Sequence, residues 1–275
     1  MNSTKKNAVH RIKIRGLPVV LCSLALGLLL FPGAIRAEEP TAVLLQPQTE
    51  ALRPGEILTY DVSWSEIVTA GIAVMEIKAG TLPDGDAVLK FIVTTRTVGI
   101  VKKFYKVNDR LESVFDPEIN QSLTFTLDQS HGKRKKKREL VFDHEKNTVV
   151  SRLNNEQPET FTIPDGTQDA LSSLYYLRTR SDFIVGKPIV VQVHDSGKTW
   201  AVEIQTLGKE QVTTPAGKFD TIKVRTFPKY EGVFMNKGEI FIWLTDDSRK
   251  VPVKMESTIS IGAIVSTLTK MESGK

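Results

Sequence analysis

Apolar and polar residues alternate through much of the chain that follows Gly55. The first clear run places Leu58, Tyr60, Val62 and Trp64 on one set of positions, with polar residues between them. A period of two predicts a β-strand with one face toward a core. Similar runs predict further strands at residues 72–78, 87–98, 104–115, 123–128, 139–142, 148–153, 189–194, 199–207, 210–213, 219–227, 239–244, 251–260 and 263–271.

Turn signals separate these runs at intervals of about ten residues. The clearest are Pro83-Asp84-Gly85-Asp86, Asp195-Ser196-Gly197-Lys198 and Pro215-Ala216-Gly217. Such short intervals leave no room for the helices that parallel crossovers need, so an antiparallel sheet is expected. The runs Val88–Val93 and Ile240–Leu244 are apolar on both alternating sets, which predicts that both faces of these strands are covered.

One segment has a helical period instead. Its apolar residues recur at spacings of three and four and are Ala170, Leu171, Leu174, Tyr175 and Leu177. The pattern predicts one amphipathic helix from Asp169 to Ser181, capped by Thr167 or Asp169. The expected fold of residues 55–275 is therefore a single mainly β domain, an antiparallel, partly open barrel or strongly curved sheet with one short helix at its open end or in its concavity.

The N-terminal residues have a different composition. A basic opening from Lys5 to Arg15 is followed by an apolar stretch from Leu17 to Phe31 and by small residues up to Ala37. This order is typical of a secretory signal peptide cleaved after Ala37, and the apolar stretch is short for a membrane-spanning helix. Residues 38–54 are polar and proline-rich, which favours a flexible leader. The protein is thus expected to be exported, most naturally to a bacterial periplasm.

The signal segment also accounts for the apparent basicity of the chain. The 275 residues carry a formal charge of +5, from 37 Lys and Arg against 32 Asp and Glu. Residues 1–37 hold six basic residues and no acidic one, so the rest of the chain is close to neutral. The single cysteine, Cys22, lies within the signal segment, and a mature protein would therefore have no disulfide, zinc-thiolate site or thiol nucleophile.

Few residues carry catalytic chemistry. His131, His144 and His194 do not follow a metal-ligand spacing, and the chain has no nucleophile elbow, phosphate loop or dinucleotide fingerprint, so no metal and no cofactor are expected. The adjacent pair Asp246-Asp247 could suggest the general acid and general base of a glycosidase. Adjacent residues on a strand point to opposite faces, however, so a turn closing on Ser248-Arg249-Lys250 is the simpler interpretation.

The densest charge feature is the run Lys133, Arg134, Lys135, Lys136, Lys137 and Arg138. It is interpreted either as a solvated strand edge, where lysines discourage edge-to-edge pairing, or as a patch that contacts an anionic membrane surface. The run has no interleaved aromatic residues, and an exported protein has no use for a nuclear signal, so nucleic acid is not expected as a partner.

Several segments, in order along the chain, resemble domain-of-unknown-function family 3108, a family of exported bacterial proteins. They are Gly55–Tyr60 with Trp64 and Ala70-Gly71, Asp169–Arg178, Thr214–Val224, and Ile242–Lys254 followed by Gly262 and Leu268. The family supplies no catalytic residues, and the basic run is not part of its pattern. By analogy of architecture, the resemblance implies a half-open antiparallel barrel similar to those of periplasmic lipoprotein and lipid carriers.

Three functional hypotheses remain open. The first is a non-enzymatic periplasmic carrier for an apolar small molecule or lipid, whose concave face would present Trp64, Leu174, Tyr175, Phe241 and Trp243; plain core packing is the alternative for each of these residues. The second is a structural or interaction protein of the envelope, which contacts a protein or an anionic lipid surface through the basic run. The third is an envelope hydrolase acting through Asp246 or Asp247, and it requires those carboxylates to lie in a cleft.

Overall fold

The computed structural model describes residues 50–230, 233–234, 239–259 and 262–274. They form 16 strands and two short helices, α1 (Val101–Phe104) and α2 (Ser172–Arg178). The first strands are β1 (Ile57–Trp64), β2 (Val68–Thr81), β3 (Ala87–Thr97), β4 (Val107–Asp116), β5 (Gln121–His131), β6 (Arg134–Asp143), β7 (Thr148–Leu153) and β8 (Glu159–Thr162). The others are β9 (Gln168–Asp169), β10 (Ile189–Asp195), β11 (Lys198–Thr214), β12 (Gly217–Tyr230), β13 (Val233–Phe234), β14 (Ile240–Thr245), β15 (Pro252–Ile259) and β16 (Gly262–Glu272).

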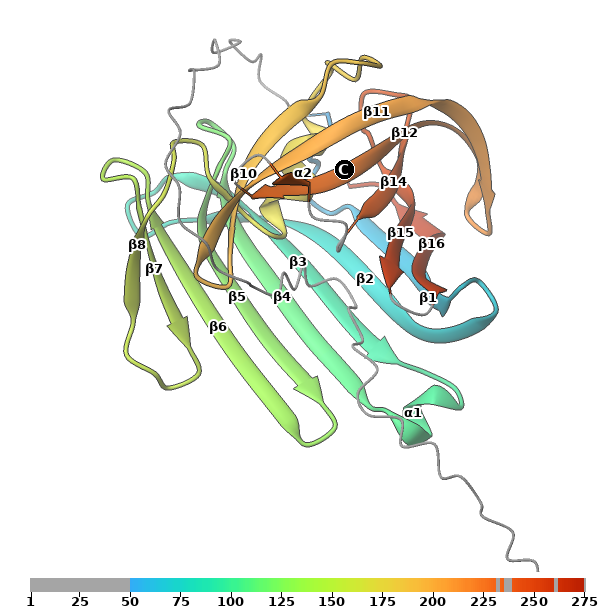
Figure 1. The fold of residues 1–275 in the computed structure, drawn as a ribbon, viewed down its shortest axis with the longest axis horizontal. Coiled ribbons are helices and arrows are strands. Elements are labelled where there is room, and N and C mark those ends of the chain that lie inside the picture. The colour runs from blue at the N-terminus through green and yellow to red at the C-terminus, as the bar shows by residue number, and fades with distance from the viewer. Residues whose placement is uncertain (1–49, 231–232, 235–238, 260–261, 275) are drawn as a thin grey trace, which may run out of the picture.

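All of these strands belong to one strongly curved sheet (Figure 1). Its order is β8-β7-β6-β5-β4-β3-β2-β1-β16-β15-β14-β12-β11-β10-β9, with β13 paired to β12. The pairings between these strands are antiparallel except for the short parallel bridge between β9 and β10. Among the described residues, the two ends of this order do not pair with each other, so the sheet is a barrel that stays open. The expected fold class is confirmed, with a second helix, α1, added.

The β11–β12 hairpin is longer than its neighbours and arches back over the sheet (Figure 1). Its register shifts between Thr206 and Gly208, and Gly208 has a φ of 149°. A side chain would strain this backbone conformation, so glycine allows the bend. Strand β11 also contacts β16, although three strands separate them in the order of the sheet.

The helix α2 lies between two groups of buried apolar side chains. On one side, the ring of Tyr175 stacks on Phe91 of β3 at a centroid distance of 3.8 Å, within a cluster that includes residues of β1 to β7. On the other side, Leu177 packs with apolar residues of β10, β11, β12 and β14, and Leu174 contacts both groups. The space directly beneath Tyr175 is therefore filled by side chains.

Several segments differ from the sequence-based expectation. The run 104–115 begins as a strand only at Val107, because residues 101–104 form α1. The helix expected over 169–181 is shorter, and residues 159–162 add a strand, β8, that the pattern does not indicate. Ala51 and Leu52 are each 5% exposed and belong to the first apolar cluster, so the last residues of the leader pack on the domain. The expected signal segment lies outside the described residues.

Candidate functional site

Asp169 fixes the start of α2 to the first half of the sheet. Its Oδ1 accepts hydrogen bonds from the backbone N–H groups of Leu171 (2.7 Å) and Ser172 (2.9 Å), and so satisfies donors that a helix start leaves without a partner. Its Oδ2 accepts hydrogen bonds from the hydroxyls of Ser113 on β4 and Ser122 on β5. Burial raises the pKa of Asp169, and these hydrogen bonds oppose the increase. The carboxyl group therefore joins β9, α2 and the β4–β5 hairpin.

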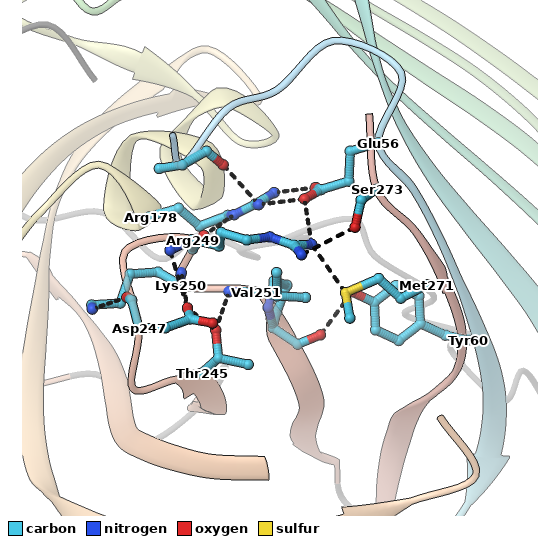
Figure 2. A network of polar contacts seen from close by, with 12 residues as sticks. Glu56, Tyr60, Arg178, Thr245, Asp247, Arg249, Lys250, Val251, Met271 and Ser273 are labelled. Carbon is cyan, nitrogen blue, oxygen red and sulfur yellow. Dashed lines mark hydrogen bonds and ion pairs between the residues drawn. The ribbon is translucent and has the colours of Figure 1, made fainter. Parts of the chain in front are cut away.

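Arg178 fixes the other end of α2. Its guanidinium donates to both carboxylate oxygens of Glu56, at 2.7 and 2.9 Å, and to the carbonyl oxygen of Ala51 at 2.8 Å (Figure 2). Its Nε donates to the carbonyl oxygen of Arg249 at 3.2 Å. The side chains of Arg178 and Glu56 are 0% and 3% exposed. Planar, two-pronged pairing of this kind is the arrangement in which arginine binds a carboxylate most strongly.

Arg249 extends this network to the C-terminal strand. Its Nη2 lies 3.4 Å from Glu56 Oε2, and its Nη1 donates to the hydroxyl of Ser273 at 3.2 Å (Figure 2). We call Glu56, Arg178 and Arg249 the arginine clamp. The clamp joins the chain before β1, the end of α2, the β14–β15 turn and the residues that follow β16.

The two candidate carboxylates of the hydrolase hypothesis lie in that same β14–β15 turn. Asp247 Oδ1 accepts hydrogen bonds from the hydroxyl of Thr245 and from the backbone N–H groups of Arg249 and Lys250. Asp246 forms an ion pair with Lys209 at 2.6 Å. Both aspartates are exposed, and Asp247 holds the shape of the turn. This placement in an exposed turn supports the structural interpretation rather than the hydrolase hypothesis.

A cleft of about 270 Å³ lies between the end of the β11–β12 hairpin and the sheet. The hairpin contributes Val212, Thr213 and Pro215 to one wall. The other wall is polar and consists of Asp61, Ser63, Glu66, Thr69, Lys254, Thr267 and Thr269. An ion pair between Lys254 and Glu66 crosses this polar wall. The cleft thus offers apolar contact from one side and hydroxyl and charged groups from the other.

Trp243 lies next to this polar wall. The ammonium nitrogen of Lys254 is 5.0 Å from the centroid of the indole ring, and that of Lys223 is 4.6 Å away. The indole N–H donates to the carboxylate of Glu210, and this hydrogen bond, together with Lys223 and Lys254, lowers the pKa of Glu210. Lys254 therefore touches both the cleft and the face of Trp243. Two cations over one ring stabilise its position by the attraction between positive charge and the π-system.

The structure brings only some of the expected ligand-binding residues together. Phe241 and Trp243 are neighbours on β14, with ring centroids 6.3 Å apart. Leu174 and Tyr175 lie on α2, and Tyr175 is fully buried against Phe91. Trp64 is 43% exposed at the end of β1, two residues before Glu66. The sequence pattern does not single out the cleft residues Asp61, Thr69 and Thr267, because they meet through the pairing of β1 with β2 and β16, and Thr213 joins them only through the long hairpin.

The basic run divides into buried and exposed members. Arg138 is 7% exposed and donates to Asp195 at 3.1 Å, which joins β6 to the far end of the sheet. Lys136 is half-buried, and burial followed by the nearby charge of Arg138 lowers its pKa. Lys137 pairs with Glu139, while Lys133, Arg134 and Lys135 are exposed. The six residues therefore do not form one uniform surface.

The three histidines in the described part of the chain have structural partners. His131 Nε2 lies 2.8 Å from Asp109, His144 Nε2 lies 2.6 Å from the carbonyl oxygen of Ser122, and His194 Nδ1 lies 2.9 Å from the hydroxyl of Thr199. Within the described part of the chain, no group of three or more His, Cys, Asp or Glu residues is placed to hold a metal ion. The same residues contain no helix that is long and apolar enough to cross a membrane.

Comparison with known proteins adds a family and a fold. The model of a family described as a protein of unknown function (DUF3108) matches residues 59–269, which confirms the resemblance drawn from the sequence. A β-barrel-like protein of another domain of unknown function, DUF1849, from Brucella abortus has 14% sequence identity and a TM-score of 0.54, over 81% of this chain and 99% of that one. A protein described as exported, from Bacteroides fragilis, has 12% identity and a TM-score of 0.36 over 80% of this chain and 97% of its own. No curated protein matches the chain.

Proposed function

The chain belongs to the DUF3108 family, and we propose that it is a non-enzymatic binding or carrier protein of the cell envelope that holds an amphipathic ligand in the cleft. The observation that carries this proposal is the contrast between the two walls of that cleft. Val212 and Pro215 face a wall rich in hydroxyl and charged groups. A ligand with one apolar side and one polar side is complementary to such a space.

The size of the cleft limits what it holds. Pockets for complete small molecules have volumes of roughly 300 to 1,000 Å³, and this cleft has about 270 Å³. We therefore assign to the cleft the polar part of an amphiphile with a short length of its chain. The rest of the ligand would extend out of the open side of the cleft.

The expected cellular location agrees with this function. The basic, apolar and small-residue order of residues 1–37 supports export, and a periplasmic protein meets amphiphiles that are in transit between membranes. The fold shared with the Brucella abortus protein supports only the architecture, an open barrel with a concave surface.

Ligand titration with cleft variants tests the proposal. Thr213 is exposed and lines the cleft, so Thr213→Trp fills it. Gln211 is exposed on the same strand and does not line it, so Gln211→Trp is the matched control. We expect wild type and Gln211→Trp to bind lysophosphatidylglycerol with the same affinity, measured by calorimetry, and Thr213→Trp to bind at least tenfold more weakly. Equal affinity for all three proteins, or no binding by wild type, contradicts the proposal.

The second candidate function is that of a structural or interaction protein of the envelope. The observation that favours it is the packing beneath α2, where Tyr175 stacks on Phe91 and occupies the concavity that a large ligand would need. Pull-down from an envelope extract, with the Thr213→Trp variant as bait, distinguishes the carrier function from the interaction function. A specific protein partner retained by this variant favours an interaction role that is independent of the cleft.

A further inference from the structure

We propose that one end of the open barrel is a docking face for an anionic lipid bilayer. This end consists of α1, the residues that flank it and the β5–β6 turn, which lie at the lower end of the sheet in Figure 1. We call it the α1 end. None of its residues lines the cleft, so the inference goes beyond the ligand-binding function.

The two segments of the α1 end are held side by side by the backbone. The N–H group of Gly132 donates to the carbonyl oxygen of Lys106 at 2.7 Å, and Val107 is paired with His131. The rings of Tyr105 and His131 have centroids 6.1 Å apart. A basic segment before β4 and a basic segment after β5 are thereby fixed as one surface.

The basic side chains of this surface point into solvent. Lys102, Lys103, Lys106, Lys133 and Arg134 are all exposed. Among the described residues, none of these five has an acidic partner within ion-pair distance, whereas Lys137 and Arg138 further along β6 are paired with Glu139 and Asp195. Four of the five are lysines, whose flexible, strongly hydrated charges suit a diffuse anionic surface better than a geometrically defined site.

Apolar side chains lie among these charges. Phe104 is 83% exposed and Ile100 is 64% exposed, with Lys102 and Lys103 between them in the sequence. Ile67, in the β1–β2 turn that lies at the same end of the sheet, is 80% exposed. Packing within the domain does not explain why apolar residues occupy these positions, because their side chains are mostly exposed. Single apolar groups surrounded by lysines are typical of surfaces that lie at the boundary between lipid headgroups and acyl chains.

The opposite end of the first half of the sheet has the reverse charge. Its turns carry the exposed acidic residues Asp84, Asp86, Glu118, Glu145 and Asp165 against one exposed lysine, Lys146. An anionic bilayer attracts the α1 end and repels this end, so the distribution of charge sets one orientation of the protein at the membrane. Each basic residue near such a surface strengthens binding roughly fivefold, and the effect decreases with added salt.

Vesicle flotation tests the docking face. The protein is produced from the full-length gene, its N-terminus is established by intact mass, and it is mixed with vesicles of phosphatidylglycerol and phosphatidylethanolamine or of phosphatidylcholine alone. The variant Lys102→Glu/Lys103→Glu/Lys106→Glu removes the central charges. The control Lys187→Glu/Lys218→Glu/Lys270→Glu makes the same change in net charge at exposed lysines elsewhere. Thermal unfolding of each variant checks the fold.

We expect wild type and the control to float with the anionic vesicles at low salt, and the first variant to bind at least about a hundredfold more weakly. Phe104→Ser should weaken binding roughly tenfold at unchanged charge. Thr213→Trp, which fills the cleft, should float like wild type. Loss of ligand binding in the cleft can therefore be distinguished from loss of docking to the bilayer. Absence of flotation, equal flotation with phosphatidylcholine, or equal losses in the two triple variants overturns the inference. Capture of an acidic protein without flotation overturns it in favour of a protein partner.

Discussion

Neutralising Glu56 should be one of the most destabilising single changes in the molecule. Glu56→Gln keeps the shape of the side chain but removes the charge that faces Arg178, which is 1% exposed. Arg249 approaches the same carboxylate to 3.4 Å, so two guanidinium groups lose their shared counter-charge. Breaking a buried pair by removing one partner costs about 3 to 5 kcal/mol. For a domain of this size, such a loss lowers the melting temperature by roughly 10 °C.

Urea and thermal unfolding, followed by circular dichroism, measure this change. Asp143→Asn is the matched control, because Asp143 forms an exposed ion pair with Lys146 at 2.6 Å. Solvent-exposed pairs contribute little to stability, so the control should unfold close to wild type. The double variant Glu56→Leu/Arg178→Met should recover part of the stability lost in Glu56→Gln, since it leaves no fully buried charge without a partner in the clamp. If Glu56→Gln costs no more than Asp143→Asn, the clamp does not hold the domain together.

Two further predictions concern buried polar groups. Asp169→Ala should lower the free energy of unfolding by about 2 to 4 kcal/mol, because the first N–H groups of α2 and the hydroxyls of Ser113 and Ser122 lose their acceptor. Urea unfolding that matches wild type would contradict the role given to this carboxyl group. The pKa of His194 is lowered to about 4, first by burial and then by the charge of Arg138, so the folded protein keeps this ring neutral while the unfolded chain protonates it below about pH 6.5. The contribution of the neutral His194 ring to the free energy of unfolding is therefore complete above about pH 6.5. It is lost as the pH falls toward 4, and the loss is no more than about 3 kcal/mol. His194→Gln should reduce this pH dependence in urea unfolding at about pH 7 and pH 4.5, and an unchanged dependence would refute the assignment.

The sequence predicts those elements whose residues carry their own local pattern. The alternation around Tyr60 and Val62 locates β1, and the three-and-four spacing around Leu174 locates α2. In β6 the charged run hides the alternation, so the pattern predicts a strand only from residue 139 although β6 begins at Arg134. The offset at α1 has a similar cause, since four residues are too few to establish a helical period.

The site depends on contacts that no local pattern encodes. Glu56 and Arg178 are 122 residues apart in the chain, and neither position differs in pattern from an ordinary surface residue. The cleft forms only because the end of the β11–β12 hairpin meets residues of β1, β2, β15 and β16, which brings Thr213 into one cleft with Thr267. Trp243 stands out in the sequence as a large aromatic residue on a strand, but its neighbours Lys223 and Lys254 come from β12 and β15.

Native mass spectrometry of the protein isolated from its own envelope tests the central claim most directly. We expect wild type to carry a bound amphiphile of defined mass, and Thr213→Trp, isolated in the same way, to carry none. Wild type that is free of ligand, or a ligand retained equally by Thr213→Trp, would contradict the assignment of the cleft between the β11–β12 hairpin and the sheet as the binding site.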